Sequence, residues 1–369
     1  MKHLSLKTLA AIAAALMMSA TFSSCDMMEE DMDDCPSGLY LTFKYDYNLQ
    51  RANMFNDHVG SVTVYIFDEQ GKLVKTQEES NVGASAPLKS PSYAMHVTDL
   101  APGKYQFIAL AGQRPYADMM ADSRARFVRT DMPDRADMTQ LGIQLDRTQT
   151  AAGMYDIVNN SLPLDTLWHG MLTTPVEVYS TSIYKPTYAT IPLVRDTKKI
   201  NVTLYQTNDP REMDIANYDM TITDRNSTLL YDNAVDESTG TVVYTPHAVW
   251  NTTFDNPMNQ NGDLLDGKGV IGHADFMTSR LVFHDDNTEN GILSIVNKTT
   301  GVEVAAIDLP YYLSQLRTSE DRYRYTEQEF LDRGYDYDIA LYLVGDKLNY
   351  IQISINVLGW SKRIQFEEL

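Results

Sequence analysis

Apolar and polar residues alternate with a period of two over many stretches of this chain, and this pattern constrains its fold more than any other feature. In the first stretch the apolar positions are Leu39, Leu41, Phe43, Tyr45 and Tyr47. Because successive side chains of a strand point to opposite faces of a sheet, the pattern predicts a strand with one buried face. Residues 199–205 and 218–223 alternate in the same way, and the 23 tyrosines of the chain favour a β-rich protein.

Further strands are predicted wherever β-forming residues lie between turn signals. They cover residues 62–67, 73–78, 93–97, 104–111, 175–180, 187–194, 241–245, 280–283, 291–296, 302–309, 337–344, 350–358 and 364–366. Residues 112–165 are expected to form loops with short helical pieces, and residues 255–270 are expected to form one long loop. Residues 310–316 and 326–333 are expected to be helical, because Pro310 begins the first and Thr326, followed by Glu329, begins the second.

The predicted strands fall into two sets of about seven, without regular alternation of strands and helices. This arrangement predicts an all-β fold of two tandem β-sandwich domains with short helical insertions. The boundary is placed near residue 195, so that the N-terminal β-sandwich covers residues 37–195 and the C-terminal β-sandwich covers residues 196–369. No long linker separates them, so the two domains are expected to pack end to end.

The N-terminal segment has the pattern of a secretory signal. Lys2 and Lys7 precede an apolar run from residue 9 to residue 18, and small residues follow up to residue 24. The run is too short for a transmembrane helix, which needs about 20 residues, so residues 1–24 are predicted to be a signal peptide. Residues 22–25, Phe-Ser-Ser-Cys, resemble a bacterial lipobox, which implies cleavage before Cys25 and lipidation of this cysteine. The alternative is an ordinary signal that leaves a free thiol.

An acidic segment follows Cys25. Its acids are Asp26, Glu29, Glu30, Asp31, Asp33 and Asp34. Such a block stays solvated, so residues 25–36 are predicted to be a lipidated tether. The block resembles the acidic export signal of surface lipoproteins in the Bacteroidetes, which implies display on the outer face of the outer membrane. A simple soluble spacer is the alternative.

Charge and cysteine content argue against several classes of partner and site. The net charge is −20 at pH 7, and so negative a field disfavours binding to nucleic acid or direct adsorption to anionic lipid. The chain has two cysteines. If Cys25 is acylated, Cys35 alone can form neither a disulfide framework nor a cysteine-based zinc site, and it is expected to be a small apolar residue at the start of the fold.

No motif of a catalytic or metal site stands out. None of the seven histidines has a metal-binding spacing, and neither a nucleophile elbow nor a Walker loop occurs. Residues 255–269 and 284–287 are rich in Asp and Asn, which leaves calcium open, although such stretches are usually only loops. Trp168, Trp250 and Trp360 are candidate sugar-stacking platforms with core or rim packing as the preferred interpretation, and His169 is expected to be a packed histidine. The sequence predicts no enzyme, no cofactor, no metal and no small-molecule substrate.

Several segments resemble the FimB/Mfa-type fimbrial anchor lipoproteins of the Bacteroidetes, which are associated with type V pili. They read CPSGLYL at residues 35–41, YDYN at 45–48, HVGSVTVYIFD at 58–68, LWHG at 167–170 and INVLGW at 355–360. The N-terminal segments, up to residue 68, are more specific than the others. The likeness extends from residue 25 to residue 369.

The resemblance implies two transthyretin-like Greek-key β-sandwiches without enzymatic activity. It also implies an outer-membrane lipoprotein that anchors a fimbria to the cell surface and limits its length. The expected partner is the first stalk subunit, which would donate a β-strand to an open sheet edge, as in donor-strand complementation. The candidate edges are Leu39, Leu41, Phe43 and Tyr45 in the first strand and Ile351, Ile353, Ile355 and Val357 in the last. The alternatives are a surface glycan-binding β-sandwich lipoprotein and an accessory or tip subunit of a fimbria.

Overall fold

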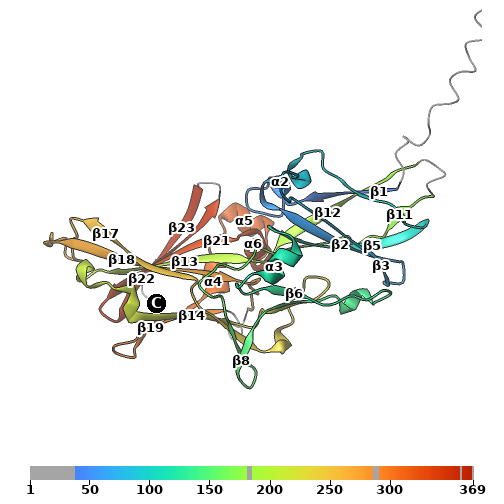
Figure 1. Ribbon diagram of the computed structural model, residues 1–369. Helices are drawn as coiled ribbons and strands as arrows, with labels where there is room; N and C mark the ends of the chain where they lie inside the picture. The colour runs from blue at the N-terminus through green and yellow to red at the C-terminus, as the bar shows by residue number, and fades with distance from the viewer. Residues whose placement is uncertain (1–37, 181–184, 286–290, 358–359, 368–369) are drawn as a thin grey trace, which may run out of the picture.

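The computed structural model describes residues 38–180, 185–285, 291–357 and 360–367, and strands dominate this part of the chain. Figure 1 shows an elongated molecule, with β1 (Leu39–Lys44) toward one end and the hairpin of β17 (Ala248–Asp255) and β18 (Lys268–Thr278) at the other. Residues 38–195 are called the N-terminal half and residues 196–367 the C-terminal half. No helix in the described part is long and apolar enough to cross a membrane. The predicted all-β class is confirmed, and the transthyretin-like Greek-key detail stays a prediction.

An eight-stranded sheet forms most of the N-terminal half, in the order β3-β2-β5-β10-β12-β1-β4, with β11 paired to β5. Besides β1, its strands are β2 (Ser61–Phe67), β3 (Leu73–Ser80), β4 (Met95–Val97), β5 (Gly103–Gly112), β10 (Trp168–Met171), β11 (Val176–Val178) and β12 (Thr187–Arg195). β12 pairs with β10 near residue 194 and with β1 over residues 187–192. Through β12 the sheet folds over, so that Leu39 and Leu41 of β1 share one core with Val62 and Val64 of β2.

Both faces of β2 are buried, which makes this strand the wall between two cores. Val62 and Val64 belong to the core of the N-terminal half, whereas Tyr65 and Phe67 belong to a larger core that extends through the C-terminal half. The neighbouring strand β5 is divided between the two cores in the same way. A strand buried on both faces is nearly continuous in apolar residues, and this explains the apolar run at residues 107–111.

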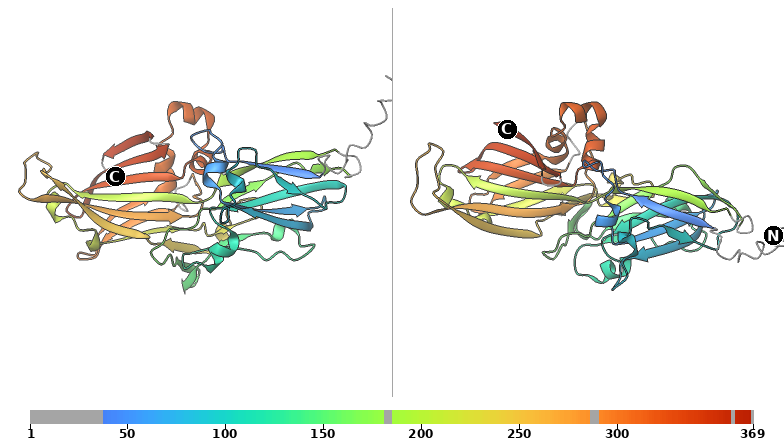
Figure 2. Two further views of the ribbon diagram at one scale, coloured as in Figure 1. Left: turned by 45° about the horizontal axis from the view of Figure 1, so that its top comes forward. Right: turned by 90° about the horizontal axis from the view of Figure 1, so that it is seen from above.

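Two six-stranded sheets, one of which includes β8 and β9 from the N-terminal half, make up most of the C-terminal half and enclose the larger core (Figure 2). The first has the order β17-β18-β13-β21-β22-β23, with β13 (Lys198–Gln206), β21 (Asp336–Val344), β22 (Lys347–Val357) and β23 (Trp360–Glu367). The second has the order β20-β19-β14-β16-β9-β8, with β8 (Thr148–Ala151), β9 (Met154–Ile157), β14 (Tyr218–Asp224), β16 (Thr241–Tyr244), β19 (Ile292–Asn297) and β20 (Glu303–Asp308). Ile200 and Val202 of β13 and Ile222 of β14 are buried in this core.

The remaining elements are short. A three-stranded sheet contains β6 (Phe127–Arg129), β7 (Ile143–Leu145) and β15 (Thr228–Leu229). The α-helices are α2 (Phe55–His58), α3 (Tyr116–Ala121), α4 (Leu309–Ser314), α5 (Ser319–Arg324) and α6 (Glu327–Arg333). The 3-10 helices are η2 (Pro87–Lys89), η3 (Met138–Gln140), η5 (Pro210–Glu212), η6 (Ile215–Asn217) and η7 (Glu237–Thr239). The predicted start of α6 is confirmed, because the Thr326 hydroxyl accepts a hydrogen bond from the Glu329 backbone N–H at 3.1 Å.

The two halves share strands. β9, from the N-terminal half, pairs in parallel with β16 of the C-terminal half over residues 154–157 and 241–244. β7 pairs with β15 across the same division. In addition, the Arg333 guanidinium at the end of α6 lies 3.9 Å from the ring centroid of Tyr47, just after β1. Residues on both sides of position 195 therefore build common sheets.

A buried polar cluster surrounds the passage from β12 to β13. The Lys198 ammonium donates hydrogen bonds to three backbone carbonyls between residues 331 and 334, at 2.7–3.1 Å. Arg280 forms two hydrogen bonds with the Asp332 carboxylate, at 2.8 and 2.7 Å. Asn233 donates to Asp196 at 2.8 Å. Burial raises the pKa of the Asp196 carboxyl and lowers the pKa of the Lys198 ammonium.

Several predicted elements differ from the observed ones. Residues 280–283 form no strand, and residues 112–165 contain β6, β7, β8 and β9 in addition to loops and short helices. β18 begins at Lys268, inside the predicted loop, and β17 was not predicted. The hairpins β2–β3 and β21–β22 and the helices α4 and α6 are confirmed.

Candidate strand-pairing surface

The first candidate edge, β1, lies between two other strands. It pairs in parallel with β12 over its whole length, and Leu39 and Leu41 also face β4 in an antiparallel ladder. The side chains of Leu39, Leu41, Phe43 and Tyr45 are buried. β1 is therefore not a free edge at its N-terminal end, because the short strand β4 covers it there.

The second candidate edge, β22, is also internal. It pairs with β21 on one side and, from Tyr350 to Val357, with β23 on the other. Ile351, Ile353 and Ile355 are buried in the larger core, and Val357 packs against it. The outer strand of this sheet is β23, which contains the strand predicted at residues 364–366 and begins four residues earlier, at residue 360.

The opposite edge of the same sheet is β17, which pairs only with β18 in the described part of the chain. None of its eight residues is buried, and Val249 and Trp250 are 48% and 41% exposed. Asp255, the last residue, is the only charged residue of the strand. β17 is therefore a long edge that has no charge before its last residue and is rich in β-branched and aromatic residues, which is the type of edge that pairs with another chain.

The other edges of the described sheets are shorter or carry charges. β4, β6, β8, β11 and β15 have two to four residues each. β3 contains Lys75 and Glu78, β20 begins with Glu303, and β23 contains Lys362 and Arg363. Short length and charge are both features that protect an edge from pairing with other chains. β17 has eight residues, and its single charge, on Asp255, lies at the end of the strand.

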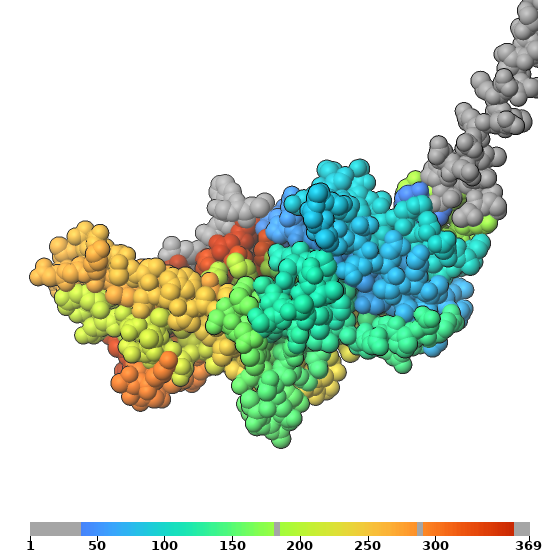
Figure 3. Space-filling view, in the orientation of Figure 1, coloured from blue at the N-terminus to red at the C-terminus, as the bar shows by residue number. Residues whose placement is uncertain are grey.

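The position of β17 separates it from the start of the fold. In Figure 3 the β17–β18 hairpin, in yellow and orange, forms the end of the molecular surface opposite the strands of the N-terminal half. Figure 2 gives the same arrangement from two further sides. A chain that is held by its N-terminus therefore presents this edge at its far end.

The candidate aromatic platforms have different environments. Trp168 is fully buried, and its ring meets that of Tyr45 edge to face at a centroid distance of 5.8 Å. Trp250 is exposed on β17 and stacks on His273 at 5.0 Å. The side chain of Trp360 lies outside the described residues. His169 donates a hydrogen bond to the Tyr231 carbonyl at 2.9 Å, and burial lowers its pKa to about 4, so this imidazole is neutral near pH 7.

The Asp/Asn-rich segments are held by internal hydrogen bonds. The Asn259 side chain accepts from the backbone N–H groups of Asn261 and Asp263, both at 2.9 Å, and donates to the Asp263 carboxylate at 3.0 Å. The His284 imidazole lies 3.0 Å from the Glu237 carboxylate. Within the described residues, no group of three or more His, Cys, Asp and Glu side chains is placed to hold a metal ion.

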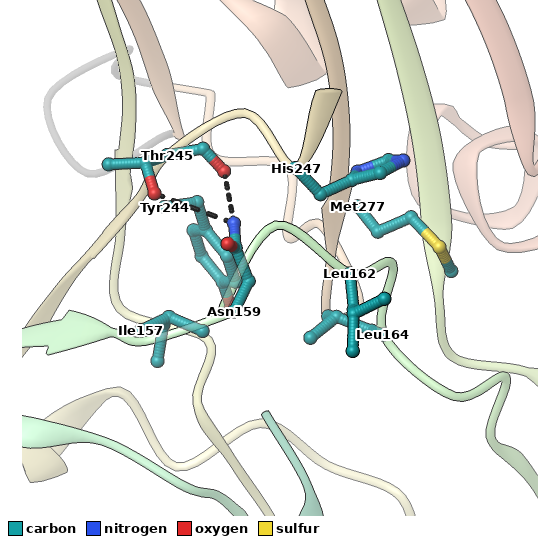
Figure 4. Close-up of a pocket in the computed structure, with 8 residues that line it drawn as sticks. All are labelled: Ile157, Asn159, Leu162, Leu164, Tyr244, Thr245, His247 and Met277. Atoms are coloured by element: carbon teal, nitrogen blue, oxygen red, sulfur yellow. Dashed lines mark hydrogen bonds between the residues drawn. The ribbon is translucent and has the colours of Figure 1, made fainter. Parts of the chain in front are cut away.

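Figure 4 shows a shallow hollow between the two sheets of the C-terminal half. Asn159 closes it by donating a hydrogen bond to the Thr245 carbonyl at 2.8 Å, and apolar side chains form most of its lining. Its interior volume is about 0 Å³ for a water-sized molecule. The hollow is therefore part of the packing and not a ligand site. Cys25 and Cys35 lie outside the described residues, so the predicted lipidation of Cys25 and the role of Cys35 stay predictions.

Comparison with known proteins decides the family. The sequence model of the fimbrillin-A associated anchor proteins Mfa1 and Mfa2 matches residues 32–366. The chain belongs to this family. Membership assigns it a fimbria-associated role at the cell surface. No significant match was found among curated proteins.

Solved structures support the same fold. A candidate adhesin from Bacteroides thetaiotaomicron is 28% identical, with a TM-score of 0.68 over 90% of this chain and 100% of its own. A candidate polysaccharide-binding protein from the same organism is 26% identical, with a TM-score of 0.64 over 89% and 99% of the two chains. The fimbrial anchor protein Mfa2 from Porphyromonas gingivalis has this fold at 18% identity, with a TM-score of 0.55 over 89% and 99%.

Sequence reasoning missed β17, although a signal was present. Val249, Trp250, Thr252, Thr253 and Phe254 all favour strands. The strand carries no alternation, because both of its faces are partly open to solvent. A strand without a buried face shows no alternation of apolar and polar residues, so hydrophobic periodicity does not predict it.

Proposed function

We propose that this protein is a non-enzymatic fimbrial anchor. Lipid on Cys25 holds it in the outer membrane, facing the exterior, and the acidic tether of residues 25–36 separates the folded body from the bilayer. The body then binds the first stalk subunit of the fimbria and limits the growth of the fibre. Membership of the anchor family, the signal-like N-terminus and the strand-rich body support this role.

The observation that carries the proposal is the free edge of β17, which has no charge before its last residue and lies at the end of the molecule opposite β1. A strand donated by the stalk subunit would extend the six-stranded sheet, because an edge strand offers a row of backbone N–H and C=O groups to a partner. Val249 and Trp250 would add side-chain contacts to these hydrogen bonds. The fibre would then leave the anchor on the side away from the membrane.

The two candidate edges of the sequence stay as a second route for strand donation. Ile351, Ile353, Ile355 and Val357 can pair with a donated strand if β23 leaves the sheet, since β23 occupies their outer side. Leu39 and Leu41 can do so if β4 leaves. Pairing with β22 or with the N-terminal end of β1 requires the loss of existing pairs, whereas addition to β17 requires none.

A charge on the β17 edge tests the proposal. Val249→Lys places a protecting cation on the exposed edge. We expect it to weaken binding of a peptide with the stalk subunit's donor strand by roughly fivefold, since a cross-strand pair contributes ~1 kcal/mol. Electron microscopy should show fewer attached and more released fimbriae. Val302→Lys, at a similarly exposed valine in the turn before β20, is the control.

The outcomes separate the candidate roles. Equal peptide binding by both variants would exclude β17 as the docking edge, and the truncation of β23 described below then tests the second route. Immunogold labelling at the free end of the fibres, instead of at the cell surface, would indicate a tip or accessory subunit. Fimbriae that stay attached and of normal length in the absence of this protein would exclude an anchor.

A further inference from the structure

Three tyrosines form a stacked ladder across the outer face of the β17-containing sheet. Tyr205 of β13 pairs in register with Tyr342 of β21, which pairs with Tyr350 of β22. The ring centroids are 4.6 and 4.1 Å apart, and the ring planes differ by 7° and 14°. Because side chains stand roughly perpendicular to a sheet, the ladder points its phenolic ends away from the core.

A groove of about 230 Å³ lies between this ladder and the β17–β18 hairpin. Phe254 and Met258 form its opposite wall, and Met258 is 58% exposed. The ring of Phe254 occupies the space above Gly269, where a Cβ would lie 2.3 Å from the ring. Glycine at position 269 is therefore required for this wall of the groove.

The walls of the groove are fixed before any ligand arrives. Gln206 lies next to Tyr205 but on the core side of β13, where its amide donates to the Tyr218 hydroxyl at 3.1 Å and to the Gly345 carbonyl at 2.9 Å. These bonds fix the end of β13 beneath the groove. The hydrogen bonds of the Asn259 side chain hold the hairpin loop, as described above. A rigid site loses little conformational entropy when it binds, which favours affinity.

The chemistry of the lining narrows the class of ligand. None of the eleven lining residues is charged, in a chain with 50 acidic and 30 basic residues. An ionic ligand would find no counter-charge there. A purely hydrocarbon ligand would lie against the hydroxyl and amide groups that make up part of the lining. A donated β-strand needs a free backbone edge. The strands of the ladder already pair on both sides, and the free edge of β17 is on the side of that strand away from β18 and the groove.

We propose that this groove binds a neutral carbohydrate. A sugar ring combines apolar C–H faces, which suit the aromatic and Met258 walls, with hydroxyl groups, which suit tyrosine and amide partners. The groove is smaller than the about 300–1,000 Å³ of a typical small-molecule site, so it accommodates a short stretch or one end of a glycan. This function goes beyond fimbrial anchoring and does not depend on it.

Affinity electrophoresis and calorimetry with the full mature chain test the site. The probes are three neutral polysaccharides, dextran, mannan and arabinoxylan, with polygalacturonate as the charged comparison. We expect binding of at least one neutral probe and none of polygalacturonate. Met258→Asp introduces a charge on an exposed residue of the groove and should weaken that binding at least about tenfold. Leu264→Asp, at a residue 63% exposed on the same loop but outside the groove, is the matched control.

A second variant tests the ladder itself. Tyr342→Ala removes the central ring and should weaken binding by up to about tenfold, while Tyr188→Ala, at an exposed tyrosine of β12, should leave it unchanged. Failure of all three neutral probes would overturn the proposal. Equal effects of Met258→Asp and Leu264→Asp on glycan binding would also overturn it. The same holds if Met258→Asp abolishes binding of the stalk peptide while Val249→Lys leaves that binding intact, because the groove would then be the site of the stalk subunit. None of these results depends on whether the protein anchors a fimbria.

Discussion

Asp224 at the end of β14 is a carboxyl that the strand pattern itself places inside the protein. Tyr218, Met220 and Ile222 face the core, and the period of two carries position 224 to the same side. Its oxygens accept hydrogen bonds from the Arg225 backbone N–H at 2.7 Å and from the Asn226 side chain at 2.8 Å. An aspartate is usually found at the surface, but the geometry of the strand and these two hydrogen-bond donors keep Asp224 buried.

Replacement of Asp224 by Asn should flatten the pH dependence of stability. Burial raises the pKa of this carboxyl to about 7, from 3.8 in the unfolded chain. Between about pH 4 and pH 7 the folded state therefore keeps a proton that the unfolded state has lost. The stability that depends on this proton is fully present below about pH 4 and is lost as the pH rises through 7. Urea unfolding between pH 4 and pH 8 should show a shallower decline in the free energy of unfolding for Asp224→Asn than for the native chain.

Asp219→Asn is the control for this experiment, because Asp219 is an exposed carboxylate on the same strand. Its stability profile should run parallel to that of the native chain. If the profile of Asp224→Asn also runs parallel to that of the native chain, the Asp224 carboxyl does not have the raised pKa given above.

The secondary-structure elements were predictable where one face of a strand is buried and the other is solvated. β1, β13 and β21 alternate clearly, and the hairpins β2–β3 and β21–β22 follow from their turn residues. β17 has no buried face, and β6, β7, β8 and β9 have only three or four residues each. Such strands exist because of their partners, so their own sequence carries little signal.

The candidate site was less predictable than the strands. A strand's sequence shows its buried face but not which neighbours flank it, and this is why β22 was assigned to an edge that β23 occupies. The tyrosine ladder could not be predicted for the same reason, because it depends on which strands are neighbours. Tyr205, Tyr342 and Tyr350 lie far apart in sequence, and the register of β13 against β21, a parallel pair, brings the first two together.

Removal of β23 should create a second edge that is free to pair with another chain. A chain that ends at residue 357 exposes the backbone of β22 along Tyr350–Val357, where β23 now pairs. Because Ile351, Ile353 and Ile355 make this strand strongly β-forming, we expect the truncated chain to self-associate. Light scattering at increasing protein concentration should show dimers or larger species, and the stalk peptide should bind more tightly than to the full chain.

Gln352→Lys in the truncated chain is the internal check, because a lysine on an edge strand opposes pairing. It should restore a monomer. A truncated chain that is monomeric without this substitution, and does not bind the stalk peptide, would exclude β22 as a latent pairing site.

The whole molecule is extended, with the start of β1 and the β17–β18 hairpin at opposite ends (Figure 1). This arrangement suits a protein that is held at one end and binds at the other. Cys25→Ala tests the lipid attachment. The variant should move from the outer-membrane fraction to the culture medium together with its fimbriae, and mass spectrometry should show no acyl group on residue 25. A variant that stays in the membrane fraction would contradict lipid attachment at Cys25.

The strands that the two halves share have a mechanical consequence. Tension on a fibre would act between the membrane end and the far hairpin, through the passage from β12 to β13. The halves can be pulled apart only if the ladder of β9 on β16 fails together with the pairing of β7 on β15 and the contact of Arg333 with Tyr47. Flow past the cell would thus load several connections in parallel, and no single covalent link would serve as a hinge.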